Sequence, residues 1–281
     1  MPELVVDGAV LHYQLRGTGP LLLISQSGEG DADRSTDLVD TLADSFTVLT
    51  YDRRGLSRSL TAEGRDAAAV ADHVDDAHRL LAALTDRPVP MLGCSLGAVI
   101  GLHLAARHPE QLSTLIAHEP VAPWLLGAEE RAHHAAELAE LQELYLRDGL
   151  AAVLPEIARV LGIDTTGRDV EEGLTPQPMD AQRRANFDRF LRHDFTALLR
   201  DDLAPDTVAA SPVRIVPAAG VTTPGEVFDR RCADALAELV GTEVAEFPGG
   251  HNGNTSHPRA YAARLVEVLL EEAGTAARAT A

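Results

Sequence analysis

The stretch GCSLG at residues 93–97 places a serine between two glycines, where an apolar run (VPML) meets a helical pattern (AVIGLHLAARHP). A Gly-x-Ser-x-Gly turn between a strand and a helix holds the serine in a strained conformation and exposes its hydroxyl at the carboxyl end of the sheet. Gly93 and Gly97 remove side chains where the two elements would collide. The pattern predicts that Ser95 is a nucleophile. A Gly/Ser turn that only permits tight helix–sheet packing is the alternative.

A serine hydroxyl becomes a nucleophile when a base takes its proton, and for this turn the chain order is serine, acid, histidine. The base is therefore expected near the C-terminus, where EFPGGHNGNTSHP holds two histidines. His251 follows an expected strand and two glycines, so it is the predicted base. His257 precedes Pro258 and is typical of a helix start. The other histidines considered are expected to be surface or packing residues: His103, His133, His134 and His193.

The acid that orients the histidine has three candidates. The loop after the strand expected at 213–216 has no carboxylate before Glu226. Glu226 and Asp229 fall at the start of a helix, where acidic residues are common because of the helix dipole. Glu119, in IAHEP, ends the strand after the elbow helix and can reach the second ring nitrogen of the base. Glu119 is the predicted acid; otherwise it is a strand-end carboxylate that caps the following turn.

The tetrahedral intermediate of acyl transfer needs two donors aimed at its oxygen. One is expected to be the amide of Leu96, directly after the nucleophile. The other is expected in ISQSGEG, the loop after the strand at 21–25, where Ser27 is the predicted donor and Gly28 lies close behind. The alternative is a plain glycine-rich turn.

These residues must be positioned by a sheet, and the chain alternates short apolar runs with longer amphipathic ones. The predicted strands are 4–13, 21–25, 47–51, 89–92, 115–117, 213–216 and 243–247, and the predicted helices are 67–84, 97–107, 225–240 and 258–272. Strands that alternate with helices indicate an α/β protein with a mostly parallel sheet covered on both faces.

Residues 121–206 break this pattern, because they are mostly helical, with a polar break at 162–180 and no convincing strand. We expect a core domain of residues 1–120 and 207–281 and a helical cap of residues 121–206. Two crossover helices with long loops are the alternative. The substrate-binding candidates are Trp124 and Leu125 at the start of the insertion and Phe187 and Phe190 within it. The alternative is that these residues only hold the cap onto the core.

The composition narrows the function classes. The chain has 281 residues and a formal net charge of −19, which argues against a nucleic-acid partner. It contains no lysine, so Schiff-base and pyridoxal chemistry are excluded. Cys94 and Cys232 have no metal-binding spacing and suggest no disulfide framework. With no signal-peptide pattern and no long apolar run, we expect a cytoplasmic protein with no membrane partner, metal or cofactor.

These motifs resemble those of the α/β-hydrolase superfamily along almost the whole chain. GCSLG resembles its nucleophile elbow, YDRRGLSRS the turn after its fourth strand, and PGGHNGNTSHP its histidine loop. The resemblance implies a mostly parallel eight-stranded sheet flanked by helices, with an inserted helical cap.

Within the superfamily, GCSLGA, HEP and PGGH…SHP look like the group that includes the fungal zearalenone lactone hydrolases. That group places its acid as a glutamate after strand six, so the likeness favours Glu119. It also implies that Ser27 and Leu96 supply the oxyanion donors. The fungal enzymes use a cap tryptophan against their substrate, whereas the only tryptophan here is Trp124, at the cap entrance.

The leading hypothesis is a cofactor-independent serine hydrolase that cleaves a carboxylic ester or lactone through an acyl-enzyme. The same residues could serve C–C bond hydrolysis, acyl transfer or cofactorless perhydrolysis. Epoxide hydrolase and dehalogenase chemistry is disfavoured, because Ser95 occupies the place of their aspartate nucleophile. A ligand receptor with vestigial catalysis is the alternative of another class. The expected partner is a small-molecule substrate, and a homodimer is left open.

Overall fold

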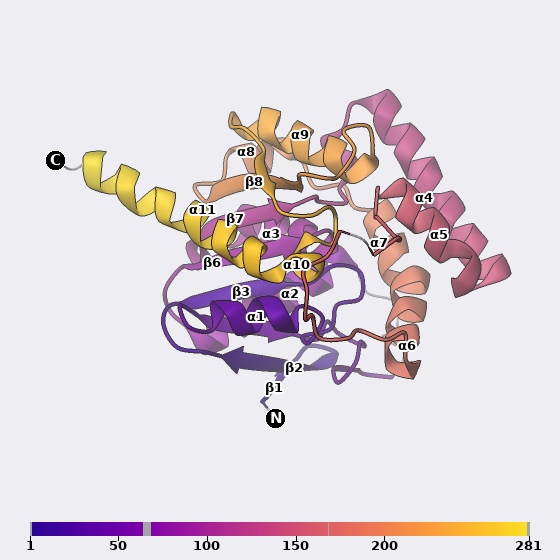
Figure 1. Cartoon of the computed structure of the whole chain (residues 1–281), viewed down its shortest axis with the longest axis horizontal. Coiled ribbons are helices and arrows are strands. Elements are labelled where there is room, and N and C mark those ends of the chain that lie inside the picture. The colour runs from indigo at the N-terminus through magenta and orange to yellow at the C-terminus, as the bar shows by residue number, and fades with distance from the viewer. Residues whose placement is uncertain (1, 64–68, 168, 280–281) are drawn as a thin grey trace.

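A mostly parallel sheet forms the centre of the protein (Figure 1). The computed structural model describes residues 2–63, 69–167 and 169–279, with side chains as far as residue 270. In these ranges the sheet has nine strands, in the order β1-β2-β4-β3-β6-β7-β8-β9, and β5 pairs with β2. They are β1 Glu3–Val6, β2 Ala9–Arg16, β3 Leu21–Ser25, β4 Thr47–Tyr51, β5 Leu60–Thr61, β6 Val89–Cys94, β7 Leu112–His118, β8 Arg214–Gly220 and β9 Ala245–Phe247.

The direction of the strands changes at β2. This strand is antiparallel to β1, β4 and β5, whereas every pair from β4–β3 to β8–β9 is parallel. The parallel strands end on the same edge of the sheet, so the loops that follow β3, β6, β7, β8 and β9 gather there. That edge is where the sequence motifs converge.

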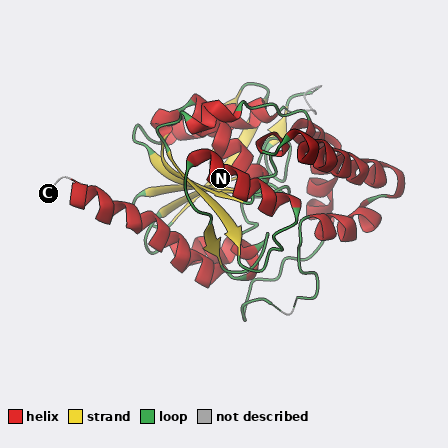
Figure 2. Cartoon of the chain, turned by 90° about the horizontal axis from the view of Figure 1, so that it is seen from above, coloured by secondary structure: helices red, strands yellow, loops and turns green. Residues whose placement is uncertain are grey.

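Helices cover both faces of the sheet (Figure 2). They are α1 Thr36–Leu42, α2 Val70–Leu84, α3 Leu96–Arg107, α8 Pro205–Ala209, α9 Phe228–Val240, α10 Gly253–Ser256 and α11 Pro258–Ala279. Because side chains alternate along a strand, Leu22 and Ile24 of β3 pack with α1 and α11, while Leu23 packs in the cluster formed by α2, α3 and α9. The α/β prediction is confirmed, with β5 as a small addition to the eight strands that the resemblance implied.

Several element boundaries differ from the sequence predictions. The strand expected at 4–13 is a hairpin of β1 and β2, because Asp7 and Gly8 form a two-residue turn in which Gly8 has φ of 71°. Strand β8 continues to Gly220 rather than 216, and α11 continues to Ala279 rather than 272. Helix α2 begins at Val70; residues 67 and 68 of the predicted helix lie outside the described residues.

Residues 121–206, here called the insertion, lie between β7 and β8 in the chain. They contain α4 Ala128–Asp148, α5 Leu150–Val160, α6 Ala181–Arg189 and α7 Phe195–Leu199, with a π-helix at Phe190–Asp194 between α6 and α7. Figure 1 shows α4 to α7 grouped beyond one end of the sheet. In its described part, 121–167 and 169–206, the insertion contains no strand.

Two further features bear on the sequence predictions. No helix in the described ranges combines the length and the apolar character needed to cross a bilayer. Cys94 and Cys232 are both buried and free.

Candidate active site

Ser95 occupies a sharp turn between β6 and α3. Its φ of 54° is a left-handed value that residues with a β-carbon rarely adopt. Gly93 and Gly97 permit this turn: a β-carbon at Gly93 would lie 2.6 Å from the Cα of Ala98, and one at Gly97 would overlap the carbonyl of Ser25. The strand, the helix and the end of β3 therefore approach each other only with glycine at both places.

Glu119 directly follows β7 and is completely buried. Its φ of 45° is a second left-handed value at a residue other than glycine. The carboxylate is fixed on both sides: Oε1 accepts a hydrogen bond from the backbone N–H of Gly220 at 2.8 Å, and Oε2 accepts one from His251 Nδ1 at 2.8 Å. The strained backbone thus aims the side chain across the end of β8 toward the histidine loop.

His251 lies in the loop after β9, and its Nδ1 meets a second buried carboxylate. Asp229, in the first turn of α9, places Oδ2 2.5 Å from Nδ1. Oδ2 lies off the direction of the Nδ1–H bond of His251 and does not accept a hydrogen bond from it. Neither oxygen of Asp229 has a hydrogen-bond partner in the described part of the chain. The side chains of His251, Glu119 and Asp229 are 3% exposed or less. Two of the three acids weighed from the sequence therefore reach the same nitrogen.

The pKa values of these groups are shifted in opposite directions. Burial raises the pKa of Asp229 to about 7, and the neighbouring Glu119 carboxylate adds to this rise against the opposing effect of His251. Burial also opposes ionisation of Glu119, but the hydrogen bond from His251 and the neighbouring imidazoles outweigh it and hold the pKa of Glu119 well below its usual range. Burial lowers the pKa of His251, yet Asp229 and Glu119 together raise it to about 10. The three groups titrate as one coupled set.

Ser95 and His251 line one cavity of about 290 Å³. Neither Ser95 Oγ nor His251 Nε2 has a hydrogen-bond partner among the residues that the structure describes, and neither atom is sealed from the cavity. Because Nδ1 is held by the carboxylates, Nε2 is the nitrogen free to accept a proton. Catalytic hydrogen bonds are often loose without substrate and tighten when it binds.

The loop after β3 also reaches this cavity, through Ser27 and Gly28. Arg53, 1% exposed, fixes the loop: Nη1 donates to the carbonyls of Gln26 at 3.1 Å and Ser27 at 2.5 Å, and Nη2 donates to that of Gly28 at 2.7 Å. Within the described ranges the backbone N–H groups of Ser27 and Leu96 have no hydrogen-bond partner. Both predicted oxyanion donors are thus unpaired.

The rest of the cavity is mainly apolar and comes from the insertion. Phe187 and Phe190 line it, and the other apolar lining residues are Leu154, Ile157, Ala158, Leu161, Ile163 and Met179. Trp124 and Leu125 do not line it, contrary to the sequence prediction. The 3-10 turn Pro123–Leu125 directs Trp124 inward, where Nε1 donates to Asp201 Oδ2 at 2.8 Å, and Leu125 packs against the core.

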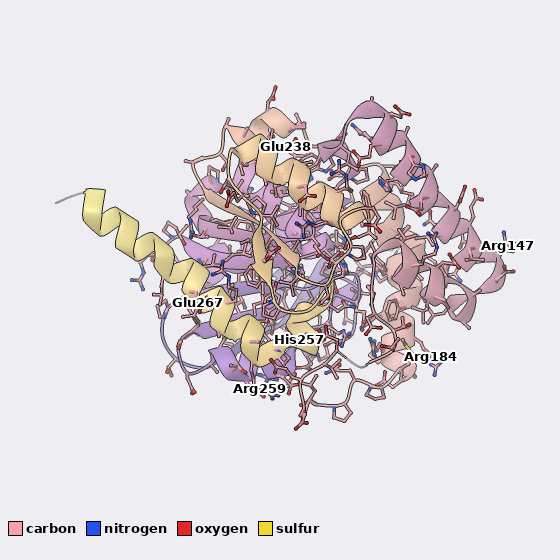
Figure 3. All side chains as sticks on the ribbon, turned by 45° about the horizontal axis from the view of Figure 1, so that its top comes forward. Arg147, Arg184, Glu238, His257, Arg259 and Glu267 are labelled. Carbon is pink, nitrogen blue, oxygen red and sulfur yellow. The ribbon has the colours of Figure 1, made fainter. Side chains whose placement is uncertain are left out.

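The rejected alternatives lie elsewhere. His257 lies between α10 and α11 (Figure 3) and does not line the cavity; its Nε2 is 3.2 Å from Asp169 Oδ1. Glu226 is exposed. Of the other histidines, His103 is buried against Asp201, and His133 and His134 lie on α4. In the described residues two groups of three side chains have metal-ligand geometry: the set around His251, and His133, His134 and Glu137.

Sequence reasoning missed four charged residues near the nucleophile. Arg53 stands in YDRRG, a motif that carries the family resemblance but does not itself indicate that the arginine anchors a loop. Glu29, Arg34 and Arg183 line the cavity, although Arg183 comes from α6, far along the chain. An arginine on an amphipathic helix gives no signal in the sequence that distinguishes a cavity wall from a solvated face.

Comparison with known proteins decides the family. The family model described as "alpha/beta hydrolase fold" matches residues 20–201. A curated relative, the uncharacterised hydrolase YraK of Bacillus subtilis, is 39% identical over 273 residues, which cover 96% of this chain and 96% of the relative. The chain belongs to the α/β-hydrolase fold family.

Solved structures show the same fold. A hydrolase from Pseudomonas aeruginosa PA01 superposes with a TM-score of 0.70 at 24% identity, covering 95% of this chain and 97% of its own. The enol-lactonase from Burkholderia xenovorans LB400 superposes with a TM-score of 0.68 at 20% identity, covering 96% and 100%. At 24% and 20% identity, these superpositions show that the fold is shared.

Proposed function

We propose that this α/β hydrolase cleaves a carboxylic ester or lactone without a cofactor, through an acyl-enzyme on Ser95. The observation that supports this most is the paired arrangement around one apolar cavity: an unpartnered serine hydroxyl in a strained turn and an imidazole whose far nitrogen is held by carboxylates. The similarity in fold to an enol-lactonase is consistent with this class of reaction.

In the proposed reaction, Ser95 Oγ attacks the carbonyl carbon while His251 Nε2 takes the hydroxyl proton. The backbone N–H groups of Ser27 and Leu96 stabilise the oxyanion, with support from the start of α3. His251 then gives the proton to the leaving alcohol oxygen. In the second half of the reaction, His251 Nε2 takes a proton from water as the water attacks the acyl-enzyme, and then gives this proton to Ser95 Oγ. This step releases the acid and restores the serine.

Glu119 is the proposed acid of this set. Its hydrogen bond to Nδ1 keeps the proton on that nitrogen and leaves Nε2 basic. The second hydrogen bond, from Gly220, fixes the carboxylate and prevents it from turning toward solvent. We assign Asp229 a supporting role, because it contacts Nδ1 off the hydrogen-bond direction.

We also propose that the insertion is a cap that selects the substrate. Its helices provide most of the apolar wall, and Phe190 packs directly over the loop after β3: a β-carbon at Gly28 would lie 2.7 Å from the Phe190 ring. A substrate in the cavity would therefore be enclosed between this wall and Ser95. Such enclosure excludes water and strengthens hydrogen bonds to the oxyanion.

The proposal is tested with a panel of p-nitrophenyl esters of increasing acyl length and a panel of lactones. We expect the wild type to hydrolyse members of one or both panels and Ser95→Ala to lose at least a thousandfold in kcat. His251→Gln should lose a similar factor. Thermal unfolding of each variant serves as the control for folding. Undiminished hydrolysis by Ser95→Ala, or no hydrolysis of any ester or lactone, would contradict the proposal.

A further inference from the structure

Three charged side chains lie together in the wall of the mainly apolar cavity that contains Ser95. Glu29 lies in the loop after β3, Arg34 precedes α1, and Arg183 comes from α6. Arg183 binds Glu29 through two contacts, Nε to Oε2 at 2.6 Å and Nη2 to Oε1 at 2.7 Å. Arg34 Nε lies 3.1 Å from Glu29 Oε1. We call Arg34 and Arg183 the arginine pair; Glu29 contacts both of them.

This group carries more positive than negative charge. One carboxylate faces two guanidinium groups, and the three side chains are between 9% and 20% exposed, so solvent screens them incompletely. Two further acids lie nearby but do not line the cavity: Asp31 accepts a hydrogen bond from Ser57 and lies 3.7 Å from Arg58, and Asp180 caps α6. Among the residues that line the cavity, two arginines therefore face a single carboxylate, in a chain with a net charge of −19.

Arg34 has unused hydrogen-bonding capacity. Each of the three guanidinium nitrogens of Arg183 already has a partner, because Nη1 also donates to the carbonyl of Gln177 at 2.6 Å. By contrast, among the residues described Nη1 and Nη2 of Arg34 have no hydrogen-bond partner. A guanidinium presents its terminal donors as a planar fork that matches a carboxylate. Arg34 thus has two terminal nitrogens available for a ligand, in the cavity wall that also contains Ser95.

We propose that Arg34 forms an anion subsite, supported by Arg183, and that the substrate is an ester or lactone that also carries a free carboxylate. This inference rests on the proposed function and adds the substrate class. The apolar lining receives the hydrocarbon part of the substrate, Arg34 binds the remote carboxylate, and the scissile carbonyl lies at Ser95. Hydrolysis of such a substrate yields a product with two carboxylates.

The test compares two esters with the same leaving group and the same chain length. p-Nitrophenyl hexanoate ends in a methyl group, and p-nitrophenyl hydrogen adipate ends in a carboxylate. We expect the wild type to prefer the adipate ester in kcat/KM. Arg34→Met should lower the ratio of the two kcat/KM values by about 10- to 100-fold, which is the range for a hydrogen bond to a charged group. Glu29→Gln should raise that ratio, because it removes the competing negative charge.

Arg184→Met is the matched control. Arg184 is the next residue on α6, is exposed, and lies on the outer side of the helix (Figure 3). Its replacement changes the net charge by the same amount as Arg34→Met, so the ratio should stay within twofold of the wild type. A wild-type ratio below one, or an equal loss of both activities in Arg34→Met, would overturn the proposal, because the arginine pair would then only tether α6 to the core.

A binding measurement separates this proposal from the proposed function. Calorimetry of the Ser95→Ala protein with monomethyl adipate and with methyl hexanoate needs no turnover. We expect the adipate ester to bind at least tenfold more tightly, and this difference should disappear in the Ser95→Ala, Arg34→Met double variant. If the preference is present but the wild type hydrolyses neither ester, the reaction assignment fails and the subsite stands. If hydrolysis is present without any preference in binding, the subsite fails.

Discussion

Separate replacement of Glu119 and Asp229 tests how the two carboxylates divide the work at His251. In serine hydrolases with one acid, its amide variant loses about ten-thousand-fold in kcat, because the imidazole adopts the wrong tautomer. Here Glu119→Gln leaves the Asp229 carboxylate 2.5 Å from Nδ1, where it still favours a proton on that nitrogen. We therefore expect a smaller loss for Glu119→Gln, of about a hundredfold, or roughly 2.7 kcal/mol.

Asp229→Asn should cost less, at most about tenfold, because the hydrogen bond from Nδ1 to Glu119 at 2.8 Å remains. The double variant has no carboxylate at Nδ1 and should approach a ten-thousand-fold loss. The double variant would then be about tenfold worse than the product of the single effects. That excess corresponds to a coupling of roughly 1.4 kcal/mol between the two carboxylates.

The assay is kcat for a p-nitrophenyl ester at saturating concentration, with thermal unfolding to show that each variant is folded. Glu226→Gln is the control, because Glu226 is an exposed acid just before α9 and should keep wild-type kcat. A greater loss for Asp229→Asn than for Glu119→Gln would refute the reasoning and make Asp229 the acid. Strictly multiplicative losses would show that the carboxylates act independently.

Three further predictions concern pH, packing and the tryptophan. The carboxylates raise the pKa of His251 to about 10, and the reaction needs the neutral imidazole, so kcat/KM should rise from neutral to alkaline pH. Asp229→Asn removes one of these carboxylates and should move the half-maximal pH downward. A pH profile that does not change in this variant would contradict the prediction. Gly97→Ala should lower the free energy of unfolding, measured in urea, by about 1–3 kcal/mol, because the added β-carbon clashes with the end of β3. Gly225→Ala is the control, because a β-carbon there has no atom within 4 Å, and it should have no such effect. Equal effects of the two substitutions would refute the close approach at Gly97. Trp124→Phe should cost about 1–3 kcal/mol of stability, because the buried Asp201 carboxylate then keeps only His103 as a partner among the described residues. The same variant should leave KM within twofold, and a large rise in KM would show that Trp124 lines the pocket.

The fold and the positions of the proposed nucleophile and base follow from local sequence signals. The glycines around Ser95 and the chain order that points to His251 are properties of short segments, and the alternation of strands and helices determines the sheet. Glu119 also has a local signal, because it ends the strand after the elbow helix. These features are predictable because each depends on a turn or a strand end rather than on distant packing.

The rest of the site depends on how elements pack. Asp229 reaches Nδ1 of His251 because β8 extends to Gly220 and the loop after it places the start of α9 beside the histidine loop. Neither the length of β8 nor the path of this loop is encoded in a short motif. From the sequence, Trp124 was as good a lining residue as Phe187, since both are apolar and lie in the insertion. The turn at Pro123–Leu125 decides between them. Arg34 lacks a sequence signal, because only packing of α6 against the core makes it part of a cavity.

Labelling with a fluorophosphonate, followed by mass spectrometry of the peptides, tests the central claim most directly. The account predicts one adduct per chain, located on Ser95, with loss of ester hydrolysis in proportion to labelling. It also predicts that His251→Gln labels at least a hundredfold more slowly while keeping its thermal stability. An adduct on another residue, or full hydrolysis by protein that carries the label on Ser95, would contradict it.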